Sequence, residues 1–303
     1  MIEHLRHSEI DKGLWDRLHT SCADRIWYMQ SWVLDRCCPE WECLIDKDQG
    51  AIMPLLWRRR FGIDYLFQPY AVQQQGVFAK VPSDALSRSF FEAVPKRFRF
   101  WDIHLNAMIS AAGLVEGTVE ENTNQTLLLS GTVEELRAGY SQGHRRNLRK
   151  AGVAAPDIVT DLRADEFVTL FRRTTAARFG GIPDGGLELL SALLEEASRQ
   201  GQCTMFAMRE EGVPIAAVCF MEWEGRSILL KSANDERGQE RHAMFHLLDH
   251  HIASKAGSDL LLDFAGSNTP SVARFNGGFG AHSSVYLHLT RNRLPLPLRW
   301  IKR

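Results

Sequence analysis

The chain has 303 residues, of which 45% are hydrophobic and 24% charged, a balance that is ordinary for a globular protein with substantial cores. At about 150 residues per domain, this length suggests two domains. Its 36 Lys and Arg residues nearly balance its 37 Asp and Glu residues, giving a net charge of −1. This excludes a global field that draws the protein to nucleic acid or a membrane, so any basic site must be local.

The six cysteines show neither a CxxC pair nor the spacing of a disulfide framework. The first fifteen residues lack the apolar segment of a signal peptide, and no apolar run is long enough for a membrane span. We therefore expect a reduced, cytoplasmic protein without a membrane span.

The first half begins with helical spacing of apolar residues over 8–36 and continues with short apolar runs over 41–67 that predict a meander of strands. Residues 71–79 and 98–105 look extended, and Ser83 is placed to cap a helix between them. Thr132 and Glu135 form a capping-box pattern that starts another helix. We place the domain boundary here, giving domains 1–130 and 131–303.

The second half reads as two helices, three antiparallel strands, helix, strand, helix and strand. Gly139 and Gly143 divide the segment after residue 132 into two short helices, the second ending at Gly152. Residues 234–240 look like a polar loop, and Asn268 and Ser271 are candidate caps of the last helix. The predicted strands and helices are 202–209, 214–223, 226–232, 241–256, 259–264, 271–276 and 284–290.

Four fixed positive charges lie within six residues of the second short helix: Arg145, Arg146, Arg149 and Lys150. At helical spacing they form a compact clamp for a phosphate, a nucleotide-linked substrate or tRNA. A solvated basic face is the alternative.

Asp263 ends an apolar strand and is followed by the small-residue loop Gly266, Ser267 and Asn268. Its carboxylate could accept a proton from an attacking amine or orient it, or could bond the loop amides. Lys231 and Ser232 end the preceding strand and either contact an acyl group or simply finish the strand.

Three histidines recur every fourth residue at His242, His246 and His250, which invites a zinc hypothesis. No HExxH pattern and no second His or Cys cluster accompanies them, so we predict no metal and a histidine row on the side of the helix opposite its apolar stripe.

The order of elements resembles the GNAT acyltransferase fold, and several motifs agree with it. Asn268, Ser271, Phe275 and Gly278-Phe279 follow the GNAT series N-x-x-A-x-x-x-Y and Gly-Phe. YSQGHRRNLRKAG and LLDFAGS resemble segments of the Fem-type branch, whose members carry tandem GNAT domains. The resemblance implies an α/β fold with a mixed α+β sheet, repeated in two GNAT-like domains.

The resemblance further implies an N-acyltransferase that moves an acetyl-type group from acetyl-CoA or another acyl-CoA to a small-molecule or peptide amine. Catalytic roles fall to Asp263 and Lys231, with the second half carrying the site. In the segment matching the acyl-CoA loop, His242 and Met244 stand where glycines belong, and Phe275 replaces the proton-donating Tyr. The binding residues expected from the clamp, the gap, the loop and the last helix are Arg145, Arg149, Lys150, Ser232, Gln239, Arg241, His242, Ala243, Gly266, Ser267, Asn268 and Phe275.

Two alternatives remain open. One is Fem-like transfer of an aminoacyl group from charged tRNA to a cell-wall precursor or peptide. The other is a catalytically inactive GNAT fold that serves as a binding module, as the lost glycines and Phe275 suggest. The sequence does not indicate an oligomeric state.

Overall fold

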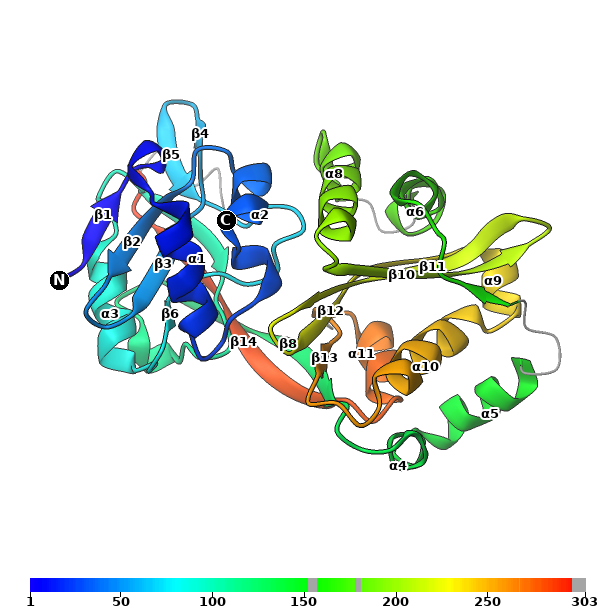
Figure 1. The fold of residues 1–303 in the computed structure, drawn as a ribbon. Coiled ribbons are helices and arrows are strands. Elements are labelled where there is room, and N and C mark those ends of the chain that lie inside the picture. The colour runs from blue at the N-terminus through cyan, green and yellow to red at the C-terminus, as the bar shows by residue number, and fades with distance from the viewer. Residues whose placement is uncertain (152–156, 178–180, 267, 296–303) are drawn as a thin grey trace. The chain divides into compact units, whose positions relative to one another are not determined.

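The computed structural model describes residues 1–151, 157–177, 181–266 and 268–295 (Figure 1). The protein is a mixed α/β protein, as expected, and divides into two compact units. One unit is Met1–Asn122 together with the chain from Val285 onward, and the other is Thr123–Ser284. The division into domains 1–130 and 131–303, each GNAT-like, stays a proposal.

The first unit holds two sheets, with strand orders β1-β2-β3-β6 and β4-β5-β7-β14. All neighbours pair antiparallel except β5 and β7, which pair parallel. Its elements are β1 (Glu3–Leu5), α1 (Lys12–Ser21), α2 (Ser31–Cys37), β2 (Glu42–Asp46), β3 (Ala51–Leu55), β4 (Trp57–Arg60), β5 (Ile63–Leu66), β6 (Phe78–Ala79), α3 (Asp84–Ala93), β7 (Phe100–His104), residues 118–122 of β8 (Thr118–Leu128), and β14 (His282–Asn292) from residue 285.

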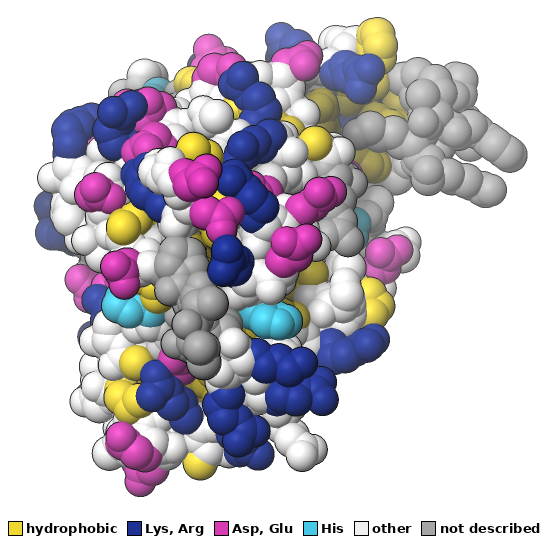
Figure 2. All heavy atoms as spheres, turned by 90° about the vertical axis from the view of Figure 1, so that its right-hand side faces the viewer, with side chains coloured by type: hydrophobic (Ala, Val, Ile, Leu, Met, Phe, Trp, Pro, Cys, Tyr) yellow, Lys and Arg dark blue, Asp and Glu magenta, His cyan; other side chains and the backbone are white. Residues whose placement is uncertain are grey.

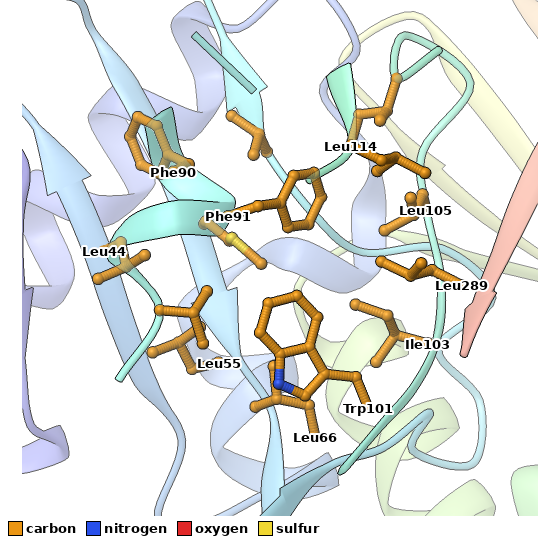
Figure 3. Close-up of a cluster of buried hydrophobic side chains, with 14 of the residues drawn as sticks. Leu44, Leu55, Leu66, Phe90, Phe91, Trp101, Ile103, Leu105, Leu114 and Leu289 are labelled. Atoms are coloured by element: carbon orange, nitrogen blue, oxygen red, sulfur yellow. The ribbon is translucent and has the colours of Figure 1, made fainter. Parts of the chain in front are cut away.

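The core of this unit lies between α3 and the sheets (Figure 3). Phe90 and Phe91 come from α3, and Trp101 and Ile103 come from β7. The ring centroids of Phe91 and Trp101 are 6.1 Å apart. Ser83 caps α3 as predicted, because its side chain accepts a hydrogen bond from the Leu86 amide. The unit thus has a hydrophobic core of its own.

The second unit is built on one sheet with the order β8-β13-β12-β11-β10-β9, and β12 and β13 are its parallel pair. Its elements after β8 are α4 (Val133–Ala138), α5 (Gln142–Ala151), β9 (Ile158–Val159), α6 (Ala164–Phe171), a π-helix (Arg172–Ala176), α8 (Gly186–Arg199), β10 (Cys203–Glu210), β11 (Val213–Trp223), β12 (Arg226–Asn234), α9 (Glu236–Glu240), α10 (Ala243–Lys255), β13 (Leu261–Asp263) and α11 (Pro270–Gly277). Short 3-10 helices occur at His7–Glu9, Trp27–Met29 and Ala111–Gly113.

Helices α6 and α8 lie on one side of this sheet, and α10 and α11 lie on the other (Figure 1). The main core lies on the α10 side, where Leu247 and Leu248 pack against β11 residues such as Val218 and Phe220. The capping box of Thr132 and Glu135 is confirmed at the start of α4. The sheet and α10 therefore form the frame on which the site is built.

Three expectations were wrong. The strand β8 was not predicted, and residues 236–240 form the short helix α9 rather than a plain loop. Helix α11 begins after Thr269 with Pro270 at its first turn and without a side-chain cap, whereas Asn268 accepts a hydrogen bond from the Thr123 amide instead. The predicted end of α5 at Gly152 lies outside the described residues.

Candidate functional site

A gap opens in the second unit where β12 outlasts its parallel partner. The pairing of β12 with β13 ends at Ile228 opposite Asp263, but β12 runs on to Asn234. On the other side, Cys219 pairs with Lys231 and Phe220 with Leu229, so one residue of β12 bulges out between them. A bulge bends a strand and increases its twist. Among the described residues, the last part of β12 therefore has a strand partner on one side only.

A cavity of about 850 Å³ lies at this end of β12. Its size is that of a site for a small molecule or cofactor. It is lined from β12, α9, the π-helix and the start of α11. The lining residues are Arg173, Thr174, Thr175, Ser232, Asn234, Asp235, Glu236, Arg237, Gln239 and Val272.

Side chains alternate between the faces of β12, and this alternation decides which of them line the cavity. Ser232 and Asn234 share one face and both line it. Lys231 does not line it and lies beside Cys219 on the other face, where burial lowers the pKa of its ammonium group. The predicted pair Lys231-Ser232 is therefore divided between the two faces of the strand.

The π-helix supplies cavity residues that the sequence did not single out. The Thr175 hydroxyl donates to the carbonyl oxygen of Ser232 at 2.9 Å, which ties the π-helix to β12. Arg173 donates to Asp235 at 3.1 Å and to the carbonyl oxygen of Pro214 at 2.9 Å. π-Helical turns are frequent at functional sites. In the sequence, this turn is indicated only by two threonines within an otherwise amphipathic helix.

Asp263 is fully buried and lines no described cavity. Its Oδ1 accepts hydrogen bonds from Asn124 at 3.0 Å and from the Ala265 amide at 2.8 Å, and its Oδ2 lies 3.4 Å from Arg226. Asn124 also accepts from the Gly266 amide at 2.8 Å. These bonds hold the turn after β13, in which Ala265 and Gly266 have φ angles of 53° and 88°. Predicted site residue Ser267 lies outside the described residues.

The backbone amides between β12 and α10 are largely occupied. Gly238 donates to the Asp235 side chain, and Gln239 donates to the Asp235 carbonyl oxygen. The Arg241 and His242 amides also donate to carbonyl oxygens of α9. A phosphate-binding loop needs such amides to be free. The amides of Gly238, Gln239, Arg241 and His242 are therefore not free to bind the pyrophosphate of an acyl-CoA.

Of the predicted residues in this segment, only Gln239 lines the cavity. Arg241 is paired with Glu210 at 2.7 Å, and Ala243 is buried in the core at the start of α10. His242 has a φ angle of 53°, a left-handed conformation that favours glycine. The backbone at His242 thus has a conformation typical of glycine, although the residue there carries an imidazole side chain.

Phe275 lies on α11 in a cluster of rings rather than in the cavity lining. Its ring centroid is 5.1 Å from that of Phe245 and 5.4 Å from that of Phe279. Its carbonyl oxygen lies 2.9 Å from Nε2 of His144, whose pKa is lowered by burial. The phenyl ring has no proton to give, so a leaving group must obtain its proton elsewhere.

The predicted clamp on α5 lies at a different place from the cavity beside β12. Arg145 and Arg149 line a second cavity of about 500 Å³, which shares no lining residue with the first. Lys150 is exposed on the same helix. Lys and Arg side chains gather on the lower part of the face in Figure 2, the level at which α5 lies in Figure 1. Of the expected residues, Ser232 and Gln239 thus line one cavity, Arg145 and Arg149 line the other, and Asp263, Lys231, Arg241, Ala243 and Phe275 line neither.

The histidine row is not a separate polar face. The ring of His250 packs edge-on against Phe206 at 4.8 Å, and Nε2 of His246 is buried. Within the described ranges, no three His, Cys, Asp or Glu side chains are grouped so as to hold a metal ion.

Residues 136–270 match the family described as the Acetyltransferase (GNAT) domain. Three solved structures share the fold at low sequence identity. The structure titled FemX has a TM-score of 0.69 at 11% identity and covers 99% of each chain. A tandem GNAT protein from the clavulanic acid biosynthesis pathway has a TM-score of 0.56 at 12% identity, covering 97% of this chain and 99% of its own.

The third structure, a GNAT-family acetyltransferase from Colwellia psychrerythraea, has a TM-score of 0.50 at 12% identity and covers 96% of this chain and 100% of its own. No curated protein sequence matches the chain. The resemblance seen in the motifs is confirmed: residues 136–270 match the GNAT acetyltransferase family, and the chain shares its fold with FemX and with a tandem GNAT protein. Family and fold together support an acyltransferase in general terms. No helix in the described part of the chain is long and apolar enough to cross a membrane.

Proposed function

We propose that the protein is an N-acyltransferase that joins an activated acyl group to an amine in the cavity beside β12. The observation that carries this proposal is the opening of the sheet after Ile228 and Asp263, which leaves the end of β12 beside a cavity of about 850 Å³. A one-sided strand presents unpaired backbone groups, so an extended acyl carrier can lie along it with hydrogen bonds like those of another strand.

The reaction is a direct transfer. The amine nitrogen attacks the acyl carbonyl carbon, the bond from that carbon to the sulfur or oxygen of the carrier breaks, and the amine loses a proton. Backbone amides of β12 polarise the carbonyl, and the cavity orients the two reactants, which together supply most of the rate gain. Phe275 cannot donate a proton, so water protonates the leaving group.

Three residues have distinct roles in this proposal. Ser232 and Asn234 line the place where the reactants meet. Lys231 has no role in the transfer, because its side chain lies on the other face of the strand and lines no part of the cavity, so solvent accepts the amine proton. Asp263 acts as a positioning residue, because its carboxylate is already engaged in holding the turn that precedes α11.

The first candidate donor is a thioester of the acyl-CoA type. The open side of β12 supports it, since a pantetheine arm is an extended chain with amide groups. The amides of Gly238, Gln239 and His242 already donate hydrogen bonds within the protein, so they do not favour binding of a pyrophosphate at the start of α10. We derive no step that uses this segment to hold a nucleotide.

The second candidate donor is an aminoacyl-tRNA, with a peptide or cell-wall precursor as acceptor, as in the Fem-like alternative. The same occupied amides favour it, because this donor places no pyrophosphate at α10. The fold shared with FemX and the exposed cations of α5 support it further.

Isothermal titration distinguishes the two donors. Acetyl-CoA titrated into the protein gives saturable heat if the donor is a thioester of this type. Charged tRNA that binds, with an affinity falling steeply as salt rises, together with no heat from acetyl-CoA, selects the second donor. A panel of amines incubated with each donor, with products detected by mass spectrometry, shows whether transfer occurs.

A blocking variant tests the place of the reaction. Ser232→Trp fills the cavity and should lower the transfer rate by about 100-fold or more, because the reactants lose their geometry. Val213→Trp is the matched control, since Val213 is exposed at the beginning of β11. Equal rates in the two variants contradict the site. No product from either donor over the whole amine panel contradicts the enzyme and favours the inactive binding module.

A further inference from the structure

The second cavity, between the end of α4, helix α5 and helix α10, is unusually rich in guanidinium groups. Arg137, Arg145 and Arg149 all line it, and its volume is about 500 Å³. Leu148 closes its apolar side. Three arginines around one open cavity are the donor set that planar, bidentate recognition of an oxyanion uses.

The one carboxylate in this cavity is already neutralised. Asp249 accepts two hydrogen bonds from Arg137, at 2.9 Å and 2.6 Å, and a third from the Tyr140 hydroxyl at 3.1 Å. Asp249 therefore fixes Arg137 and Tyr140 in place and offsets a single positive charge. Arg145 and Arg149 remain as a surplus of two charges.

These two arginines lie one helical turn apart on the exposed face of α5. Arg145 donates one hydrogen bond, at 2.9 Å, to the carbonyl oxygen of Ala138, which directs its guanidinium toward the end of α4. Most of its donors and those of Arg149 are engaged by no interaction recorded among the described residues. Their charges are available to a ligand.

His246 adds a second observation. Its ring lines the cavity from α10, and its Nε2 is buried without a hydrogen-bond partner among the described residues. Burying a polar nitrogen without a hydrogen-bond partner costs free energy. A ligand that supplies the missing partner offsets this cost. An oxyanion does so, because it accepts a hydrogen bond from Nε2 once this atom is protonated.

We propose that this cavity binds the phosphate group of a small-molecule ligand, with Arg145 and Arg149 as its ionic partners and His246 as a third hydrogen-bond donor. The tetrahedral group has enough oxygens to accept from all three. The inference does not depend on acyl transfer, because binding to this cavity is measured without donor or acceptor. The failure of either proposal leaves the other standing.

The first test is a titration of the full-length protein with inorganic phosphate at fixed pH and ionic strength, followed by calorimetry. Arg145→Ala and Arg149→Ala should each weaken binding by about 10-fold or more, since each removes a charge-assisted hydrogen bond. Arg146→Ala is the matched control: it removes the same charge from the same exposed helix, but Arg146 does not line the cavity. It should change the affinity by less than about 2-fold.

The second test follows His246 with sulfate, whose charge stays constant between pH 5.5 and 8. The groups that face His246 are Asp249 and His242 on α10, Arg137 and Tyr140 at the end of α4, and Arg145 and Arg149 on α5. Burial and His242 lower the pKa of His246 while Asp249 raises it. Sulfate should bind more tightly as the pH falls, with proton uptake, and His246→Asn should remove this dependence.

Several results would overturn the proposal. Binding that does not saturate, or an equal loss in Arg146→Ala and Arg149→Ala, means that α5 is only a solvated basic face. A short RNA that binds with a steep salt dependence while phosphate does not bind means that the surface takes a nucleic acid backbone instead. A His246→Asn variant with the same pH dependence as the parent protein removes His246 from the site.

Discussion

The Nε2 atom of His144 on α5 lies 2.9 Å from the carbonyl oxygen of Phe275 on α11. A carbonyl oxygen only accepts, so Nε2 carries the proton and Nδ1 is free to accept from the Ser141 hydroxyl at 2.9 Å. The imidazole is buried and lies against the rings of Phe245 and Phe279. One neutral histidine thus joins the helix with the cationic cavity to the helix that borders the β12 cavity.

This contact depends on Gly278. A Cβ atom at Gly278 would come within 1.9 Å of the His144 ring, so Gly278→Ala must displace the imidazole. We expect the free energy of unfolding to fall by about 1–3 kcal/mol, the usual cost of overpacking. Gly277→Ala, at the neighbouring last residue of α11, is the control, because its new Cβ would meet only the flexible end of Gln125, at 3.1 Å. Urea unfolding compares the two, and equal losses would contradict the role of His144.

Much of the fold follows from local patterns in the sequence. The antiparallel strands β10, β11 and β12 are apolar runs separated by turn residues, and the capping box at Thr132 has a specific spacing. The strand β8 lacks such a signal, because its first half is polar and exposed. Strand character there comes from neighbours in the sheet, which a single sequence does not reveal.

The candidate site is less visible in the sequence for a similar reason. Ser232 was singled out as the end of a predicted strand and Gln239 by its position in a motif, and both line the cavity. The point where β12 leaves β13 depends on register between strands distant in sequence. The π-helix that brings Thr175 to Ser232 depends on packing as well. Local pattern identifies the strands, whereas the cavity arises from where their pairing stops.

Acid should destabilise the protein through His251. Its ring is buried and stacked on Phe220 at 3.6 Å, and burial lowers its pKa to about 3. Below about pH 6.5, the His251 imidazole binds a proton in the unfolded chain but not in the folded chain. The free energy of unfolding therefore decreases as the pH falls through 6.5. One such group costs about 1.4 kcal/mol per pH unit.

The variant His251→Phe isolates this contribution. Phenylalanine retains the stacking on Phe220 and does not titrate. Between pH 6.5 and 5, the slope of unfolding free energy against pH should decrease by about one proton relative to the parent protein. His19 in the first unit, with a pKa of about 3 for the same reason, supplies an unchanged background in both proteins. Identical slopes measured by urea unfolding at several pH values would rule out the explanation.

Asp263→Asn separates a positioning role from a catalytic one. The substitution leaves Arg226 without its buried partner, a loss of about 3–5 kcal/mol for pairs of this kind. The transfer rate should fall because the turn before α11 loosens, but its pH profile should keep its shape. Asp259→Asn, at an exposed position two residues before β13 begins, is the control. A pH limb that disappears only in Asp263→Asn would make this carboxylate the general base.

Lys231→Met should raise stability and leave the transfer rate nearly unchanged. Burial lowers the pKa of Lys231, which means that folding disfavours its charged form at neutral pH. The unfolded chain binds this proton more readily, so replacing Lys231 by an apolar side chain of similar length removes a penalty and raises the free energy of unfolding. Because Lys231 lines no part of the β12 cavity, the substitution should leave the pH dependence of the transfer rate unchanged.

The Lys231→Met variant should therefore react at about the parent rate at every pH. Lys255→Met is its control. Lys255 is the last residue of α10 and is paired with Glu222 at 2.6 Å. That variant should lose a little stability and no activity, because a partly exposed ion pair contributes little. A Lys231→Met protein that reacts slowly at every pH and has lost a rise of the rate with pH would make Lys231 the acceptor of the amine proton.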